Sequence, residues 1–304
     1  MALKAQWWTC EFLRKSEPMN HYVRALRPVH WSKSLLVAAA PLAAGVPLES
    51  RVLTNLAYSV IAFVAASSAV YLMNDVRDQE NDRRHPEKRL RPVASGAITK
   101  RSAALMAGVA LLLSAGFLSM VGLDMFLPWS VYVAVNVAYS FGLKNVPILE
   151  IVLVASGFLV RLIAGSMASN IPISIWLFVC VGCASLMVVS GKRLAEKSVT
   201  QGSARRTLTH YTQSSLTAAI WILGLVLVVS YLGWFIWGIE TLPGVQLVLR
   251  LLSVFAVGGV VVRYLAVSKK KIAETPELLF ASDRFIALIT LTWAITFLGA
   301  NLFA

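Results

Sequence analysis

Residues 52–82 read VLTNLAYSVIAFVAASSAVYLMNDVRDQEND, an apolar run that ends in a cluster of carboxylates. A helix of about 20 mostly apolar residues is long enough to cross the hydrocarbon core of a bilayer. The run from Val52 to Asp75 has this length, and Asp75, Asp78 and Asp82 lie at its end. We therefore expect a membrane span that carries an acidic face at one membrane surface.

The composition of the whole chain also indicates an integral membrane protein. Of its 304 residues, 58% are hydrophobic and 14% are charged, and the mean hydropathy is +0.70. Soluble domains are about 45–50% apolar and about 25% charged, so this chain does not resemble one. The formal net charge of +13 is positive, and in a membrane protein the positions of the Lys and Arg residues along the chain indicate its orientation. Nucleic-acid binding is not expected.

Nine segments are long and apolar enough to predict an all-α bundle of nine transmembrane helices. They are Pro28–Val46, Val52–Asp75, Ser102–Val121, Met125–Leu143, Pro147–Ala168, Ile173–Gly191, Ser214–Trp237, Val245–Val267 and Phe285–Phe303. The first is the weakest, because only fifteen residues separate Lys33 from Glu49. We expect a single transmembrane catalytic domain at 28–304, preceded by an interfacial N-terminal segment at 1–27.

The basic residues alternate between the predicted loops. All of the 28 Lys and Arg except Arg51, Arg161 and Arg250 fall on one side of the nine-span topology. Because basic loops stay on the cytoplasmic side, the N-terminus is expected inside and the C-terminus outside an inner (plasma) membrane. The long basic loops are also on that side, so the active site is expected at the cytoplasmic face.

The acidic residues at the end of the second predicted span form the strongest functional signal. On a helix, Tyr71, Asp75, Asp78 and Asp82 share one face over about three turns. Carboxylates that repel one another in this way suit a divalent cation, and Mg²⁺ commonly takes one or two carboxylates together with substrate phosphate oxygens. The alternative is a solvated helix end that the following arginines neutralise.

A basic loop follows directly, and Pro86 and Pro92 are expected to fold it back over the carboxylates. Such cations beside metal-binding carboxylates suit a diphosphate. Contact with anionic lipid headgroups is the alternative for each of them. His85 is interpreted as part of the loop structure. The candidate substrate-binding residues of this segment and its approach are Asn74, Arg83, Lys88, Arg89 and Arg91.

Other polar residues converge on the same predicted face. In the fifth span, Glu150 and Arg161 lie on one helix face, which favours a polar cavity wall over a structural ion pair. Cys180 and Cys183 are interpreted as small packing residues. Glu277, Asp283 and Arg284 suit a solvated loop equally well. The further candidate substrate-binding residues are Lys33, Tyr139, Lys144, Arg161, Lys192, Arg193 and Glu196.

With these residues, the sequence resembles the UbiA superfamily of membrane prenyltransferases. The first acidic motif of that superfamily, N-D-x-x-D-x-x-x-D, matches Asn74, Asp75, Asp78 and Asp82 without a gap. The resemblance extends from about Arg27 to Arg284. The second acidic motif of the aromatic prenyltransferases is missing, because the corresponding segment 191–196 reads GKRLAE. Within the superfamily, the chain is most similar to the branch that phosphoribosylates decaprenyl phosphate.

The resemblance implies an enzyme that transfers 5-phosphoribose from phosphoribosyl diphosphate to a polyprenyl phosphate, as in the synthesis of cell-wall arabinan precursors. It implies Mg²⁺ as the cofactor, held by Asp75, Asp78 and Asp82 as catalytic residues. It implies as partners phosphoribosyl diphosphate, a polyprenyl phosphate lipid and the membrane, with a homo-oligomer left open. One rival function is aromatic prenyl transfer from a prenyl diphosphate. A more distant one is membrane transport.

Overall fold

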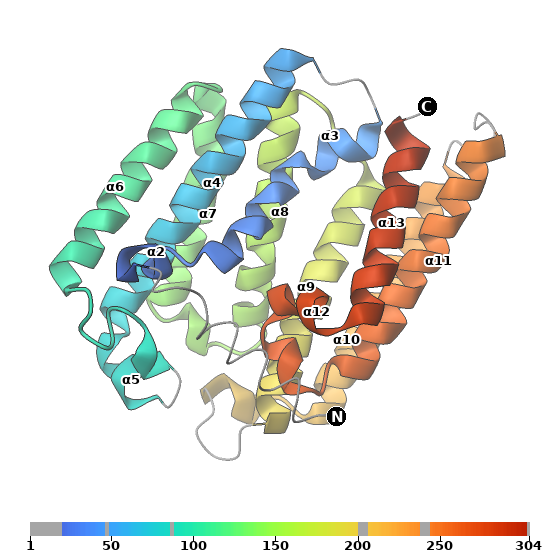
Figure 1. Cartoon of the computed structure of the whole chain (residues 1–304). Helices are drawn as coiled ribbons and strands as arrows, with labels where there is room; N and C mark the ends of the chain where they lie inside the picture. Colours follow the sequence, from blue (N-terminus) through green and yellow to red (C-terminus); the bar gives the residue numbers. More distant parts are fainter. Residues whose placement is uncertain (1–19, 46–48, 86–87, 200–205, 238–243, 303–304) are drawn as a thin grey trace.

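The computed structural model of the chain is a helical bundle (Figure 1). It describes residues 20–45, 49–85, 88–199, 206–237 and 244–302, and no strand occurs among them. Its longer helices run along one common direction. In chain order the α-helices are α2 (His21–Ala25), α3 (Ala39–Ala44), α4 (Ser50–Arg77), α5 (Gln79–Arg84), α6 (Lys100–Ser119), α7 (Phe126–Ser140), α8 (Leu149–Ser169), α9 (Ile175–Val199), α10 (Gln213–Ile236), α11 (Gly244–Val267), α12 (Leu279–Ser282) and α13 (Arg284–Leu302).

Short 3₁₀ segments join many of these helices. They are η1 (Pro28–Ala38), η2 (Lys88–Leu90), η3 (Leu123–Met125), η4 (Leu143–Asn145), η5 (Arg206–His210), η7 (Lys271–Glu274) and η8 (Pro276–Leu278). Within the described part of the chain, seven helices are long and apolar enough to cross a membrane: α4, α6, α8, α9, α10, α11 and α13. The chain is therefore a multi-pass membrane protein by the length and composition of its helices.

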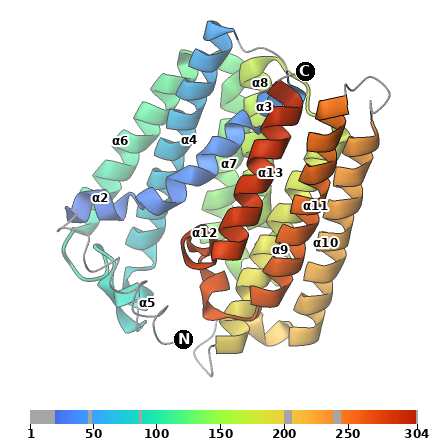
Figure 2. The same cartoon turned by 45° about the vertical axis from the view of Figure 1, so that its right-hand side comes forward.

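Two of the nine expected spans are shorter than a membrane-crossing helix. The fourth is α7, which has 15 residues. The first is divided into the 11-residue η1 and the 6-residue α3. Together η1 and α3 cross the bundle obliquely and pack on α4, α8 and α13 (Figure 2). The expectation of one regular first helix is therefore wrong for the described residues.

The reason for the irregular first segment lies in its close approach to α8. A Cβ atom placed on Gly165 would lie 1.7 Å from the carbonyl oxygen of Val37, so only glycine allows this contact. Pro28 begins η1 at a position where its missing N–H costs no hydrogen bond. Arg27 precedes it with a left-handed backbone, at φ 54° and ψ 63°. The backbone of η1 consequently lies directly against the α8 backbone.

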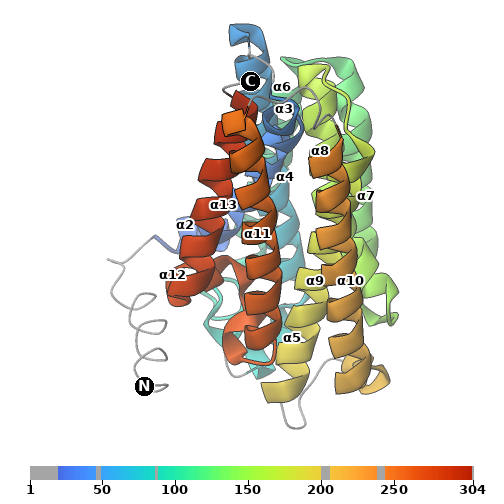
Figure 3. The ribbon, with the colours of Figure 1, turned by 90° about the vertical axis from the view of Figure 1, so that its right-hand side faces the viewer.

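The core is divided into an α4 side and an α10 side, with α8 between them. Phe63, Leu118 and Val160 pack on the first side, and Leu194, Ile220 and Val267 on the second. Viewed from the side of α10 and α11, the long helices have similar heights (Figure 3). Large apolar side chains on the outside of the bundle include Leu105, Leu112, Leu225 and Phe255. Such an outer surface suits contact with lipid chains.

Candidate active site

The acidic motif lies toward one end of the bundle, where α4 leads into α5 (Figure 1). α4 ends at Arg77 and α5 begins at Gln79, with Asp78 between them at φ −89° and ψ 8°. The amide N–H of Asp78 still donates to the Asn74 carbonyl, and that of Asp82 to the Asp78 carbonyl, each at 2.8 Å. Helical hydrogen bonding thus continues through Asp78, so the whole acidic motif lies on a nearly continuous helix.

Two of the three aspartates are buried and share one arginine. The Asp75 and Asp82 side chains are 2% and 6% exposed. The Arg91 Nη1 atom lies 3.3 Å from Asp75 Oδ1 and 2.7 Å from Asp82 Oδ2. Arg27 adds a second contact to Asp75, at 2.5 Å from Nη2 to Oδ1. Cations from both sides of the motif therefore contact Asp75 and Asp82, and the burial of these two carboxylates differs from the solvated helix end of the alternative interpretation.

The third aspartate faces a different cation. Both carboxylate oxygens of Asp78 accept hydrogen bonds from Lys144 Nζ, at 2.8 and 2.7 Å. Consistent with this separation, no three His, Cys, Asp or Glu side chains in the described ranges converge on one point. The three carboxylates do not form a ready cage for a metal ion.

The donor set nevertheless fits a magnesium ion that is shared with a phosphate. Carboxylate oxygens of Asp75 and Asp82 both lie within 3.3 Å of one guanidinium nitrogen, so they are close enough to share a cation. Mg²⁺ usually takes one or two carboxylates and completes its shell with water and phosphate oxygens. A pair of carboxylates with Asp78 beside it meets that requirement.

Other residues of the basic loop have different surroundings. Arg83 Nε donates to the Ala94 carbonyl at 3.1 Å. Arg89 is exposed and Lys88 is half-buried. His85 Nδ1 accepts from the Lys88 amide at 3.3 Å, which confirms its place in the loop structure. Of the expected cation cap over the acidic face, Arg91 contacts the carboxylates directly.

Asn74 connects the acidic motif to the end of α7. Its side-chain oxygen accepts a short hydrogen bond from the Ser140 hydroxyl. Tyr139, the neighbour of Ser140, lies within electrostatic range of Arg193. The α7 end thus places Ser140 against Asn74, and η4 brings Lys144 to Asp78.

The α9 residues are arranged differently from the expectation. Arg193 donates to both carboxylate oxygens of Glu150 on α8, at 2.7 Å from Nε and 2.6 Å from Nη2. Its Nη1 atom donates to both oxygens of Glu196, at 2.9 and 2.8 Å. Glu150 therefore pairs with Arg193 and not with Arg161 of its own helix. The guanidinium of Arg193 already donates hydrogen bonds to two carboxylates. We therefore do not assign it to phosphate binding in this structure.

Lys192 is nearer to the other site residues. It lies within electrostatic range of Glu196, Lys33 and Glu277. Gly191, before it, has Tyr264 so close that a Cβ atom would lie 2.1 Å from the phenol oxygen. The α9 backbone therefore lies directly against Tyr264 of α11 at this position.

Arg161 is a buried cation in the middle of α8. Its Nη1 donates to the Gly157 carbonyl at 2.8 Å, and its Nη2 contacts the hydroxyls of Ser67 and Tyr132 at 2.8 and 3.0 Å. Its residue exposure is 5%, and its Nε atom has no hydrogen-bond partner. Within the part of the chain that the structure describes, no carboxylate pairs with it. A charge at this depth is usually functional, so Arg161 stays a candidate for an anionic ligand.

Lys33 contacts a residue that the sequence left undecided. Its Nζ atom lies 2.5 Å from Glu277 Oε1, and His30 Nδ1 lies 3.1 Å from the same oxygen. The Glu277 side chain is 11% exposed. Although burial opposes it, the contacts with His30 and Lys33 hold the pKa of Glu277 well below its usual range. The solvated-loop interpretation of Glu277 is therefore wrong.

Arg27 and Glu277 belong to the site although the sequence did not mark them as site residues. For Arg27, the sequence did contain a signal. This basic residue directly precedes Pro28, which begins the first predicted span. For Glu277, no local pattern distinguishes it from Asp283, which pairs with Arg263 at 2.7 Å. Only the packing of η8 against the rest of the bundle brings Glu277 to Lys33.

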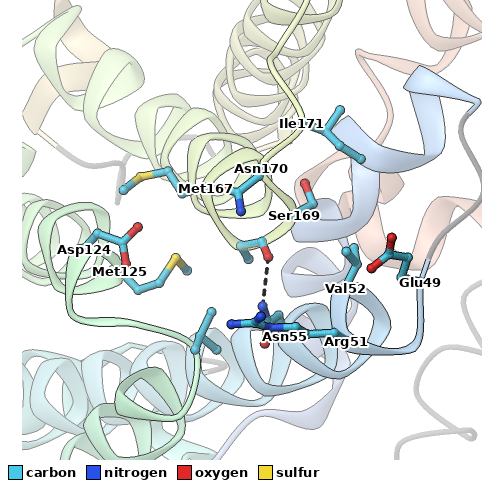
Figure 4. Close-up of a pocket in the computed structure, with 12 residues that line it drawn as sticks. Glu49, Arg51, Val52, Asn55, Asp124, Met125, Met167, Ser169, Asn170 and Ile171 are labelled. Atoms are coloured by element: carbon cyan, nitrogen blue, oxygen red, sulfur yellow. Dashed lines mark hydrogen bonds between the residues drawn. The ribbon is translucent and has the colours of Figure 1, made fainter.

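A separate cavity of about 470 Å³ lies at the other end of the bundle, where α4 begins and α8 ends (Figure 4). Its lining includes Glu49, Arg51, Asn55, Asp124 and Asn170. The amide of Asn55 donates to the Ala168 carbonyl at 3.3 Å across it. None of the candidate site residues lines this cavity.

Comparison with known proteins places the chain in a family. Residues 34–289 match the UbiA prenyltransferase family. The chain is 37% identical to a decaprenyl-phosphate phosphoribosyltransferase of Mycobacterium tuberculosis, over 90% of this chain and 92% of that protein. It is 39% identical to the protein of that name from Corynebacterium glutamicum, over 70% of this chain and 66% of that protein.

Solved structures share the fold at lower sequence identity. A UbiA homolog from Archaeoglobus fulgidus, bound to GPP and Mg²⁺, has a TM-score of 0.68 and 16% identity. The match covers 93% of this chain and all of that chain. A digeranylgeranylglyceryl phosphate synthase has a TM-score of 0.65 and 12% identity, over 93% of this chain and 97% of its own.

Proposed function

The chain belongs to the UbiA prenyltransferase family, and we propose that it transfers 5-phosphoribose from phosphoribosyl diphosphate to a polyprenyl phosphate such as decaprenyl phosphate. The C1–O bond to diphosphate breaks, and its electron pair leaves with the diphosphate. An oxygen of the lipid phosphate forms the new bond to C1. The observation that carries the proposal is the similarity over about 90% of the chain to enzymes of this name.

The acidic motif is the proposed site of the leaving diphosphate. Asp75, Asp78 and Asp82 would hold Mg²⁺, which neutralises negative charge on the leaving group when it is bound. Arg91 and Lys144 already contact these carboxylates, so both cations lie beside the position of the diphosphate. As the C1 bond breaks, the ribose gains positive charge, which the nearby carboxylates stabilise.

The α9 segment supports this donor over a prenyl diphosphate. A second acidic motif in this place would supply carboxylates for a further metal ion. Here Glu196 is paired with Arg193, which also neutralises Glu150. Lys192 is the neighbouring cation and is proposed to contact a donor phosphate. A site with more cations and fewer metal ligands suits a donor that carries three phosphoryl groups.

The lipid phosphate is proposed to lie on the side of Lys33 and Arg161. It is already anionic at neutral pH, so it requires orientation and not a general base. Arg161 lies inside the bundle, and η1 with Lys33 crosses in front of α8. The isoprenoid chain would then contact the apolar outer surface of the helices.

The proposal includes the membrane and the orientation. The enzyme is assigned to the inner (plasma) membrane, with the acidic motif facing the cytoplasm, where soluble phosphoribosyl diphosphate is available. The end of α13 lies at the other end of the bundle from α5, which supports opposite sides for the site and the C-terminal helix end (Figure 1).

One experiment separates the proposed reaction from its rival. Purified protein in detergent receives labelled phosphoribosyl diphosphate with decaprenyl phosphate, and in a parallel reaction labelled prenyl diphosphate with an aromatic acid. We expect a labelled lipid-soluble product in the first reaction, together with equimolar diphosphate. A prenylated aromatic product, without phosphoribosylated lipid, would contradict the proposed function.

A further inference from the structure

One carboxylate on the loop between α11 and α13 occupies an anion position beside the acidic motif. Glu277 Oε1 lies 2.5 Å from Lys33 Nζ and 3.1 Å from His30 Nδ1. Both of these groups come from η1, so two nitrogen atoms one turn apart lie within 3.1 Å of one carboxylate oxygen. A phosphate oxygen is the other common partner of such a pair of nitrogen atoms.

The surroundings of this pair carry additional positive charge. Lys33 lies within electrostatic range of Arg161, and Glu277 within that of Lys192. Arg161 has hydroxyl and carbonyl partners, and no carboxylate within the described ranges contacts it. A buried cation without an anion is costly, so the region attracts a second negative group.

This anion position adjoins the proposed reaction centre. The His30 ring lies 5.1 Å from the ring of Tyr71, measured between centroids. The guanidinium carbon of Arg27, which contacts Asp75, lies 4.7 Å from the same ring. Tyr71 precedes Asp75 by one helical turn. A phosphate between His30 and Lys33 would therefore be next to the donor.

We propose that His30 and Lys33 form a phosphate-monoester subsite, and that Glu277 occupies it in the free enzyme until a substrate phosphate displaces it. The inference rests on the proposed function for the identity of that phosphate. Both the lipid acceptor and the 5-position of the donor carry a phosphate monoester. The neighbouring Arg161, inside the bundle, favours the lipid phosphate.

Displacement requires only a small movement. Glu277 is on the three-residue η8, between the buried Ala273 and Leu279, which anchor the loop on either side. Rotation of the Glu277 side chain frees Lys33 without moving these anchors. A phosphate monoester carries up to two negative charges, so it binds the ammonium more strongly than the single carboxylate that it replaces.

The test is to remove the competing charge while keeping the shape of the side chain. In Glu277→Gln, the KM for decaprenyl phosphate should fall by about fivefold or more, because a charged hydrogen bond no longer competes for Lys33. The KM for phosphoribosyl diphosphate should stay within about twofold. Asp283→Asn is the matched control, since Asp283 lies on the same connection but pairs with Arg263. Asn preserves its helix cap, and neither KM should change in this control.

Binding measured without turnover separates this inference from the proposed reaction. Labelled farnesyl phosphate and ribose 5-phosphate are bound to wild-type protein and to Glu277→Gln in detergent. Tighter binding of farnesyl phosphate supports a subsite for the lipid, and tighter binding of ribose 5-phosphate assigns it to the donor. Either result stands even if the wild type forms no phosphoribosylated lipid.

Unchanged or weaker binding of both probes would overturn the subsite and leave Glu277 as a residue that only positions Lys33. If Glu277→Gln does not fold, Glu277→Asp provides the same test. The shorter Asp side chain keeps the charge but reaches Lys33 less well. The Glu277→Asp protein should therefore bind one of the two probes more tightly than the wild type. Binding of both probes equal to or weaker than the wild type would again reject the proposal.

Discussion

Arg193 of α9 and Glu150 of α8 form a buried bidentate ion pair, at 2.7 Å from Nε to Oε1 and 2.6 Å from Nη2 to Oε2. Their side chains are 3% and 0% exposed. Glu196 contacts the remaining Nη1 atom of the same guanidinium. This carboxylate–arginine–carboxylate cluster joins α8 and α9. It lies in the segment where aromatic prenyltransferases of the same superfamily carry a second acidic motif.

The first prediction concerns Arg193. Arg193→Ala should destabilise the protein by about 3–5 kcal/mol, because it leaves Glu150 buried and unpaired. Thermal unfolding in detergent checks this, and the donor KM of any folded fraction should change little. Lys192→Ala should show the reverse, with a raised donor KM and little loss of stability. If Arg193→Ala raises the donor KM without lowering the melting temperature, Arg193 contacts substrate.

The second prediction concerns Asp78, the most exposed of the three motif aspartates. Asp78→Asn should reduce turnover by about 100-fold or more, since it removes charge stabilisation at the leaving group. Its side chain is 28% exposed, so the melting temperature should change little. Glu80→Gln, on the exposed side of α5, is the matched control and should retain activity. Equal activity of the two variants would remove Asp78 from the site.

The third prediction concerns the metal ion. Treatment with EDTA should abolish phosphoribosyl transfer, and added Mg²⁺ should restore it, because the leaving diphosphate requires a neutralising cation. Initial rates at several free Mg²⁺ concentrations measure the dependence. Asp75→Asn and Asp82→Asn should both require more Mg²⁺ for half-maximal rate. A rate that EDTA does not change would exclude the metal role of these aspartates.

The fourth prediction concerns the contact of η1 with α8. Gly165→Ala should destabilise the protein by about 1–3 kcal/mol, because its methyl group overlaps the Val37 carbonyl. Since η1 also carries Lys33, the variant should lose activity even where it folds. The control is Gly116→Ala on α6, where a Cβ atom meets nothing within 4 Å. The measurement is the melting temperature of each variant. Equal melting temperatures would contradict the close packing of η1 on α8.

The fifth prediction concerns the orientation in the membrane. Cys10 lies outside the described residues, but its segment is expected in the cytoplasm. With Cys180 and Cys183 replaced by Ser, an impermeant thiol reagent should not label Cys10 in intact cells. Asp124→Cys, at the other end of the bundle, should be labelled in a Cys10→Ser background. Labelling of Cys10 and protection of position 124 would reverse the proposed orientation.

Much of the helical architecture could be predicted from the sequence by itself. A bilayer requires long apolar helices, so the apolar runs of the sequence predicted nine spans, and seven of these are helices long enough to cross it in the described residues. The acidic motif was also evident, because Asp75, Asp78 and Asp82 are close in sequence and their spacing follows the helical period. These features depend on local sequence, and the sequence was therefore sufficient to determine them.

The tertiary structure alone decided which charges meet. Glu150 and Arg161 share one helix face, yet each finds its side-chain partners on other helices, because rotation and packing of neighbouring helices set those contacts. Likewise Glu277 reaches Lys33 across more than 240 residues of sequence, whereas Asp283, on the same connection, pairs with Arg263. The irregular η1 packs against α8 at Gly165, where only a glycine leaves room for the Val37 carbonyl. Sequence period specifies a helix face, whereas the partner of that face depends on how the whole bundle packs.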